Sequence, residues 1–114
     1  MHITIQLKEA QAAEWRNWAW QRTHFVLRRM RDWVGSVQLR LSDTNGPRGG
    51  EHDKRCAIEL RSEQHGTLVV SATGKHWGAA INAALRKLAR QLSRTHHRQA
   101  TQPRLAVAHA RVSN

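Results

Sequence analysis

Acidic residues are missing from the second half of this sequence. The last one is Glu63, and residues 64–114 hold eight Lys and Arg, so this segment supplies +8 of the formal net charge of +11. A charge that serves only solubility is normally mixed in sign, whereas a segment of one sign repels itself and usually meets a polyanion. RNA, DNA and anionic lipid are therefore the partners to consider.

Three further features that the sequence lacks bear on where in the cell the protein works. No run of 18 apolar residues occurs, which argues against a transmembrane helix. The first ten residues, MHITIQLKEA, lack the basic-then-apolar layout of a signal peptide, and the single cysteine, Cys56, cannot form an internal disulfide. We therefore expect a cytoplasmic protein without a membrane span, and its 114 residues suffice for one domain.

Signals for metal or catalytic chemistry are also scarce. His96 and His97 are adjacent and His52 lies four residues before Cys56, but no CxxC, HExxH or comparable ligand spacing occurs. No pair of carboxylates stands in an apolar setting, and Cys56 falls on the inward side of a predicted strand, as buried thiols do. We predict no metal, no cofactor and no enzymatic activity.

Four segments have the patterns of β-strands. Residues 2–7, 37–41 and 56–61 alternate polar and apolar side chains, which is typical of a half-buried strand. Residues 67–72 are more continuously apolar and suit a central strand. The tetrapeptide EQHG at 63–66 predicts a hairpin turn between the last two strands.

Two segments predict amphipathic helices. The first covers about residues 10–33, with an apolar stripe of Trp15, Trp18, Ala19, Val26, Met30 and Trp33. The second covers about residues 74–94, with a stripe of Trp77, Ile81, Ala84, Leu85, Leu88 and Leu92. Trp20 projects away from the first stripe beside Leu27, and this pair is either an exposed patch for weak self-association or a partner, or is covered by the C-terminal tail.

The order of these segments predicts the fold class. A β-α-β-β-β-α chain with half-buried strands indicates an α+β two-layer sandwich, in which two helices cover one face of a four-stranded sheet. Double-stranded RNA-binding modules share this scaffold, although a fold alone does not fix a function. We expect residues 1–94 to form the domain and residues 95–114, which show no sustained period, to form a flexible basic tail.

The polar side of the second predicted helix is the main candidate for function. Arg86, Arg90 and Arg94 follow an i, i+4, i+8 spacing and so form one row, without an acid four residues away to neutralise them. Lys75 and Lys87 add to the same side. We predict a phosphate-binding face; the alternative is an ordinary solvated face, although such faces normally carry both signs.

A glycine-rich loop, GPRGG at 46–50, is the second candidate. Glycine allows close approach of the backbone to a ligand. Arg48 lies within the loop and Lys54 and Arg55 follow it, so the segment is suited to holding a phosphate. It lacks the Lys-Ser/Thr ending of a Walker loop, and a plain connection between strands is the alternative.

Two stretches resemble a known family. DTNGPRGGEHDKRC (43–56) resembles the loop-and-strand signature of the short ribosome hibernation-promoting factors and ribosome-associated inhibitors, also called sigma-54 modulation proteins. ATGKHWGAAINAALRKLARQL (72–92) resembles the closing helix of that family. The family has the same β-α-β-β-β-α order, and the resemblance covers about residues 22–94.

The resemblance implies binding to the small ribosomal subunit in the channel for messenger and transfer RNA. Such proteins block initiation and preserve idle ribosomes during stress. Lys87 and Arg90 in the matched helix, with Arg86 and Arg94 beside them, would touch ribosomal RNA phosphates. The chain departs from the family at His76 and Asn82, where acids are common, and in its Trp-rich first helix. A general binder of structured RNA and a protein-interaction module that uses Trp20 and Leu27 are the alternatives.

Overall fold

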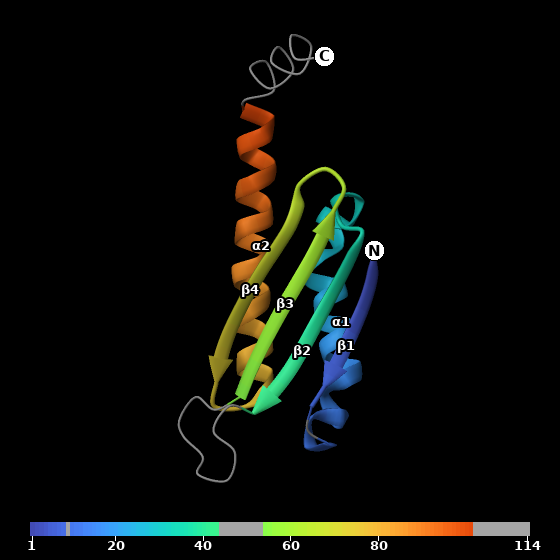
Figure 1. Ribbon diagram of the computed structural model, residues 1–114, viewed down its shortest axis with the longest axis vertical. Helices are drawn as coiled ribbons and strands as arrows, with labels where there is room; N and C mark the ends of the chain where they lie inside the picture. Colours follow the sequence, from blue (N-terminus) through green and yellow to red (C-terminus); the bar gives the residue numbers. More distant parts are fainter. Residues whose placement is uncertain (9, 44–53, 102–114) are drawn as a thin grey trace.

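The computed structural model describes residues 1–8, 10–43 and 54–101. Within these ranges the elements follow the order β-α-β-β-β-α, and a 3₁₀ helix flanks the first α-helix on each side. Figure 1 shows the four strands side by side with both helices behind them. The α+β two-layer fold predicted from the sequence is confirmed.

The sheet is mixed. Its strands are β1 (His2–Leu7), β2 (Ser36–Asp43), β3 (Lys54–Ser62) and β4 (Gly66–Gly74), and they lie in the order β1-β2-β3-β4. β1 pairs in parallel with β2, while β2 with β3 and β3 with β4 pair antiparallel. A parallel pair needs a crossover connection, and the first helix supplies it. β1 and β4 therefore form the two edges of the sheet. The central position predicted for residues 67–72 is wrong, because one face of β4 is open to solvent and Val69 in its apolar run is exposed.

The predicted turn between β3 and β4 is present. The Ser62 hydroxyl accepts a hydrogen bond from the backbone N–H of His65 at 3.1 Å. Gly66 follows with a φ of +77°, a conformation that residues with a side chain rarely adopt. These two features join β3 to β4 in a short hairpin.

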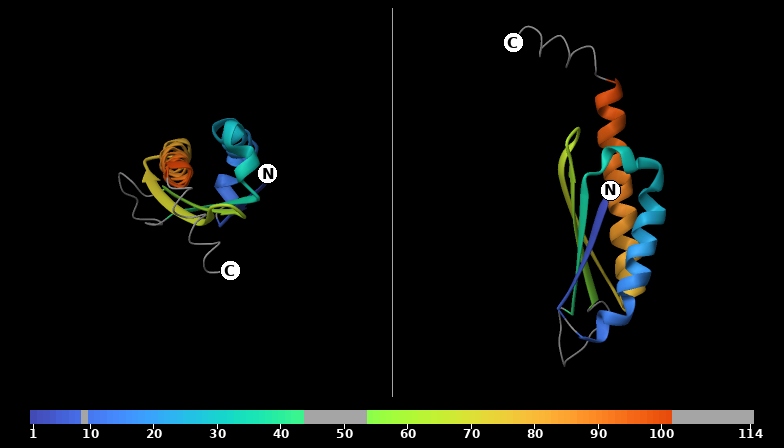
Figure 2. Two further views of the ribbon diagram at one scale, coloured as in Figure 1. Left: turned by 90° about the horizontal axis from the view of Figure 1, so that it is seen from above. Right: turned by 90° about the vertical axis from the view of Figure 1, so that its right-hand side faces the viewer.

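The core lies between the sheet and the helices, which cover one face of it (Figure 2). The helix α2 (Trp77–Thr101) buries the whole stripe predicted for it, from Trp77 to Leu92. The inward side chains of the sheet are also apolar and buried: Ile5, Val37, Leu39, Leu41, Cys56, Ile58, Leu60, Val70 and Ala72. Burial raises the pKa of the Cys56 thiol to about 12.

The first helix differs from its prediction. The α-helix α1 covers only Arg16–Leu27, and the flanking segments Ala10–Trp15 and Arg28–Trp33 are 3₁₀ helices. A 3₁₀ helix has three residues per turn, so a stripe extended at 3.6 residues per turn loses its alignment. The side chains that are fully buried are Ala12, Ala19, Thr23 and Leu27, and the Thr23 hydroxyl is satisfied by donating to the Ala19 carbonyl at 2.7 Å.

Two predictions about the first helix are wrong for this reason. Trp18, expected in the core, is 36% exposed. Leu27, expected to share an exposed patch with Trp20, is fully buried, whereas Trp20 is 43% exposed and stacks on His24 with ring centroids 5.3 Å apart. The predicted Trp20–Leu27 surface for self-association therefore does not form.

The second helix is longer than predicted. We expected it to end near Arg94, but α2 continues to Thr101. His96 packs on Trp33 of the second 3₁₀ helix, which anchors the additional turns. The first residues of the expected tail are therefore helical; residues 102–114, and the loop with Arg48, lie outside the described residues.

Candidate nucleic-acid interface

The start of α2 is fixed by a cap and a close contact. His76 stands before the first helical residue, and its Nδ1 accepts a hydrogen bond from the backbone N–H of Ala79 at 3.2 Å. Its carbonyl accepts another from Ala80 at 3.1 Å. A Cβ at Gly78 would lie 3.2 Å from the Trp15 ring, so glycine allows the first 3₁₀ helix to approach α2 here. Lys75 is exposed just before this cap.

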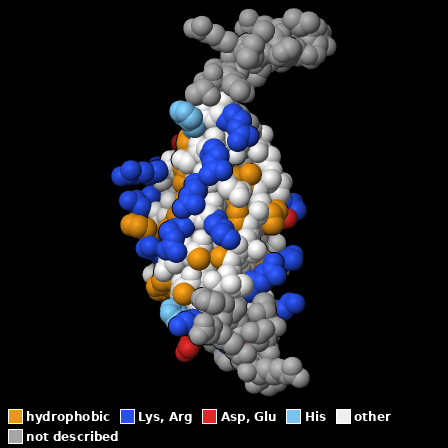
Figure 3. Space-filling model, turned by 90° about the vertical axis from the view of Figure 1, so that its left-hand side faces the viewer, with side chains coloured by type: hydrophobic (Ala, Val, Ile, Leu, Met, Phe, Trp, Pro, Cys, Tyr) orange, Lys and Arg blue, Asp and Glu red, His pale blue; other side chains and the backbone are white. Residues whose placement is uncertain are grey.

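The exposed side of α2 carries a row of arginines, which we call the basic row: Arg86, Arg90, Arg94 and Arg98. A rise of 1.5 Å per residue separates neighbours in the row by about 6 Å, which is close to the spacing of successive phosphates in a stacked nucleic-acid strand. No acidic residue follows Glu63, so α2 has none of its own. Figure 3 shows the Lys and Arg side chains running along this helix.

Sequence reasoning found three members of the basic row and missed the fourth. Arg98 continues the four-residue spacing of Arg86, Arg90 and Arg94. It lies beyond Arg94, where the sequence pattern predicts the end of the helix. The spacing itself was the signal that would have found it.

Lys87 lies beside the basic row but contacts the sheet. Its Nζ donates a hydrogen bond to the backbone carbonyl of Ser71 in β4 at 2.9 Å. β4 is an edge strand, whose outward carbonyls have no partner strand. Lys87 therefore closes part of this edge and places its positive charge between the basic row and the sheet.

Lys54 and Arg55, adjacent in sequence, lie on opposite faces of β3. The Nζ of Lys54 pairs with Oδ2 of Asp43 at 2.9 Å on the helix side of the sheet and lies 5.4 Å from the centre of the Trp77 ring. The Lys54 side chain is only 19% exposed, so it lies largely inside the domain rather than on its surface. Arg55 is exposed on the open face, opposite Ser42 and Thr73.

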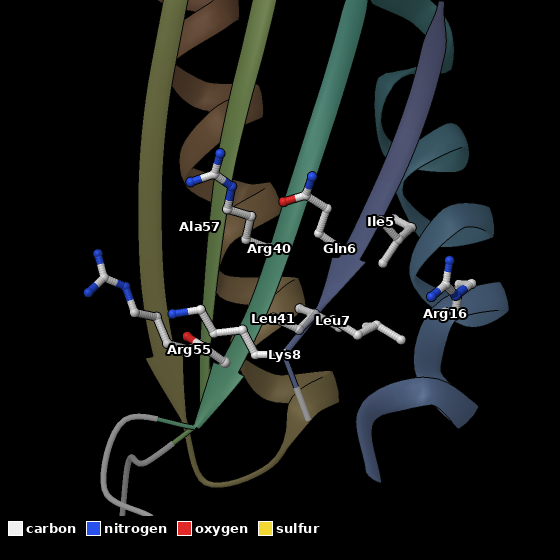
Figure 4. Close-up of a pocket in the computed structure, with 10 residues that line it drawn as sticks. Ile5, Gln6, Leu7, Lys8, Arg16, Arg40, Leu41, Arg55 and Ala57 are labelled. Atoms are coloured by element: carbon white, nitrogen blue, oxygen red, sulfur yellow. The ribbon is translucent and has the colours of Figure 1, made fainter. Parts of the chain in front are cut away.

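A basic hollow lies at the end of the sheet where Arg55 is found, and it extends past the β1 edge to Arg16 of α1. Its volume is about 670 Å³, and it is lined by four cations from separate parts of the chain: Lys8, Arg16, Arg40 and Arg55. Figure 4 shows the Arg40 and Arg55 side chains over the strands, and Arg16 on α1 beyond β1. None of the described residues that line the hollow is acidic.

The hollow was not predicted as a unit. The alternation of β2 places Arg40 outward, but nothing in the local sequence brings it next to Lys8 and Arg16. That grouping depends on the pairing of β1 with β2 and on the position of α1. The glycine-rich loop that was predicted as a phosphate cradle lies outside the described residues, including Arg48.

Residues 1–8, 10–43 and 54–101 contain neither a metal-binding cluster nor a membrane-spanning helix. No three His, Cys, Asp or Glu side chains in these ranges gather closely enough to hold a metal ion. No helix in them is both long and apolar enough to cross a membrane.

The fold and the basic row define a small α+β domain whose two α-helices carry basic side chains and no acidic ones. The chain belongs to the Sigma 54 modulation protein / S30EA ribosomal protein family, whose model matches residues 5–100. The family resemblance read from the sequence is thereby confirmed, and with it the assignment to a family of ribosome-associated modulation factors.

Solved structures show the same fold. A ribosomal subunit interface protein from Coxiella burnetii is 16% identical with a TM-score of 0.61, and the match covers 85% of this chain and 99% of that one. The N-terminal domain of Protein Y from Thermus thermophilus is 20% identical with a TM-score of 0.65, covering 82% and 98%. No curated protein sequence matches this chain.

Proposed function

We propose that this protein is a ribosome-binding hibernation factor that inhibits translation. It binds ribosomal RNA of the small subunit in the channel for messenger and transfer RNA, and it works in the cytoplasm without a cofactor. The observation that carries this proposal is the basic row, four exposed arginines on a helix whose own sequence contains no acidic residue. Membership in a ribosome-associated family supports ribosomal RNA as the polyanion.

The contacts in this proposal are electrostatic. Arginine side chains on one helix face reach phosphates along one strand, and each contact releases condensed counterions from the RNA. About four such contacts give a steep fall of log affinity with log salt, on the order of 0.7 to 0.9 per phosphate. Inhibition follows from occupancy, because a folded domain in the channel excludes messenger and transfer RNA.

The test is charge reversal in the middle of the basic row. Arg86→Glu with Arg90→Glu removes two attractions and adds two repulsions toward phosphate, and both side chains are exposed, so the melting temperature should stay close to that of the wild type. We expect this variant to lose cosedimentation with small subunits at moderate salt. Arg29→Glu with Arg31→Glu is the matched control, with the same change of charge on the second 3₁₀ helix.

Two outcomes would change the proposal. If the folded Arg86/Arg90 variant travels with small subunits as the wild type does, the basic row is not the binding surface, and the basic hollow with Arg40 and Arg55 becomes the leading candidate. If a structured RNA competitor displaces the wild-type protein from subunits at equal concentration, the protein is a general RNA binder on this scaffold.

A further inference from the structure

One face of α1 exposes aromatic rings. Trp18 is 36% exposed and Phe25 is 52% exposed, and residues seven apart lie on the same side of an α-helix. Arg22 stands between them on that side, four residues after Trp18 and three before Phe25. We call this set the aromatic face of α1.

The aromatic face borders α2. The Nε of Arg22 donates a hydrogen bond to Oδ1 of Asn82 at 3.0 Å, and Asn82 lies one helical turn before Arg86. Trp18 packs edge-on against Trp15 with ring centroids 5.4 Å apart, and Trp15 lies against Gly78 of α2. The aromatic face therefore leads directly to the start of the basic row.

Arginines frame the exposed ring of Phe25. The guanidinium carbon of Arg28 lies 4.0 Å from the ring centre and that of Arg22 lies 5.6 Å from it. Arg28 is held there by a hydrogen bond from Nη1 to the Phe25 carbonyl at 2.6 Å. Figure 3 shows hydrophobic side chains interspersed with Lys and Arg on the side of the molecule where α2 lies. A surface of π faces among cations suits a ligand that has both a flat ring and a negative charge.

We propose that the aromatic face of α1 stacks unpaired RNA bases while the basic row holds phosphates of the same strand. This inference rests on the proposed function in taking RNA as the partner, and it adds that the bound segment is single-stranded. In a duplex each base is already stacked on its neighbours, so only an unpaired base can lie on Phe25 or Trp18. The basic row alone would not distinguish single-stranded RNA from a duplex, because both present phosphates.

The test compares RNA ligands that differ only in their bases. The full chain is titrated, by fluorescence anisotropy, with a short oligoadenylate, with an abasic oligomer of equal length and with a duplex. We expect the wild type to prefer the oligoadenylate to the abasic oligomer. Phe25→Ala should weaken binding of the oligoadenylate roughly 5- to 150-fold, the range that corresponds to one base–aromatic stack. The salt slope should not change, because no phosphate contact is removed.

Two further variants separate stacking from other effects. Phe25→Leu keeps an apolar side chain without a π face and should reduce the preference for bases as much as Phe25→Ala does, whereas a hydrophobic contact with a protein would survive it. Trp20→Ala removes an exposed indole from another face of the same helix and should leave the preference intact. Equal binding of the two oligomers by the wild type, or an equal loss from Trp20→Ala and Phe25→Ala, would overturn the inference.

This outcome is independent of the test of the basic row. If the Arg86/Arg90 variant still binds small subunits but Phe25→Leu loses the base preference, the aromatic face is an RNA contact and the basic row is not the ribosome-binding surface. If the row is required and Phe25→Leu behaves as the wild type, the row stands and the aromatic face is not an RNA contact.

Discussion

His96 lies flat against the indole of Trp33, with ring centroids 3.5 Å apart and 18° between the ring planes. The Nδ1 of His96 is also 3.2 Å from Nε2 of His65, and the His65 ring meets Trp33 edge-on at 5.8 Å. The three rings come from the end of α2, the β3–β4 turn and the second 3₁₀ helix. They tie three separate parts of the chain together at the point where α2 passes the end of the sheet.

We therefore expect His96→Ala to loosen the end of α2. A stacked aromatic pair contributes about 0.5–1.5 kcal/mol beyond its buried area, so the free energy of unfolding should fall by about 1 kcal/mol. Amide exchange of residues around Arg94 should accelerate while that of Ile81 and Leu85 stays slow. The control is His97→Ala, an exposed neighbour, which should change neither measurement.

Lys87 and Arg90 should differ in what they contribute. Lys87→Met removes the hydrogen bond to the Ser71 carbonyl and should lower the free energy of unfolding by about 0.5–1.5 kcal/mol. Arg90→Met should leave stability unchanged and weaken binding to small subunits. Denaturant melts and cosedimentation on both variants check this, and an unchanged melt for Lys87→Met would contradict the edge contact.

Because His76 caps α2, we expect substitutions at this position to change the stability of the protein in a graded way. His76→Ala removes the acceptor for the Ala79 N–H and should cost about 0.5–2 kcal/mol. His76→Asp supplies an acceptor and places a negative charge at the positive end of the helix dipole, so this variant should be at least as stable as the wild type. Thermal melts of the three proteins should follow the order Asp, His, Ala; equal stability of His and Ala would show that the cap is unimportant.

Cys56 should make stability depend on alkaline pH. Its pKa is raised to about 12 in the folded protein, against about 8.5 for an unperturbed thiol. The folded state thus keeps a proton that the unfolded state loses, so the stabilisation is complete below about pH 8.5 and is lost as pH rises from there toward 12, by at most about 1.4 kcal/mol per pH unit.

The measurement for Cys56 is unfolding by urea at a series of pH values. Cys56→Ala should lack this part of the decline and should bind RNA as the wild type does. Native Cys56 should also react slowly with thiol reagents near neutral pH. Fast labelling of the folded protein would mean that the thiol is accessible.

β1, β2, β3 and the buried stripe of α2 could be predicted because their patterns repeat with one period. The continuous apolar run of β4 predicted a strand but not its place at the edge of the sheet. Alternation at Cys56, Ile58 and Leu60 gave the buried face of β3 correctly. The same parity places Lys54 inward and Arg55 outward, so the sequence already held the reason why the two basic residues of the matched loop signature lie on different faces.

The first helix could not be predicted in the same way. Its period changes twice, at Arg16 and at Arg28, where 3₁₀ and α-helical turns meet. Local composition does not mark these changes, and the two 3₁₀ segments make contacts with distant parts of the chain, Trp15 with Gly78 and Trp33 with His96. For this reason the exposure of Trp18 and the burial of Leu27 were known only from the tertiary structure.

The parallel pairing of β1 with β2 also bears on the order in which the chain folds. β2, β3 and β4 pair antiparallel with their neighbours, and a short turn links β3 to β4. The pairing of His2 with Ser36 is less local, because the whole first helix lies between these residues in the sequence. Closing the longer loop costs more chain entropy before its contacts form. We expect β2, β3 and β4, together with α2, to form the folding nucleus. β1 and α1 should then dock late during folding and detach first during unfolding. The part of the molecule that carries the basic row would then be in place before the part that carries the aromatic face.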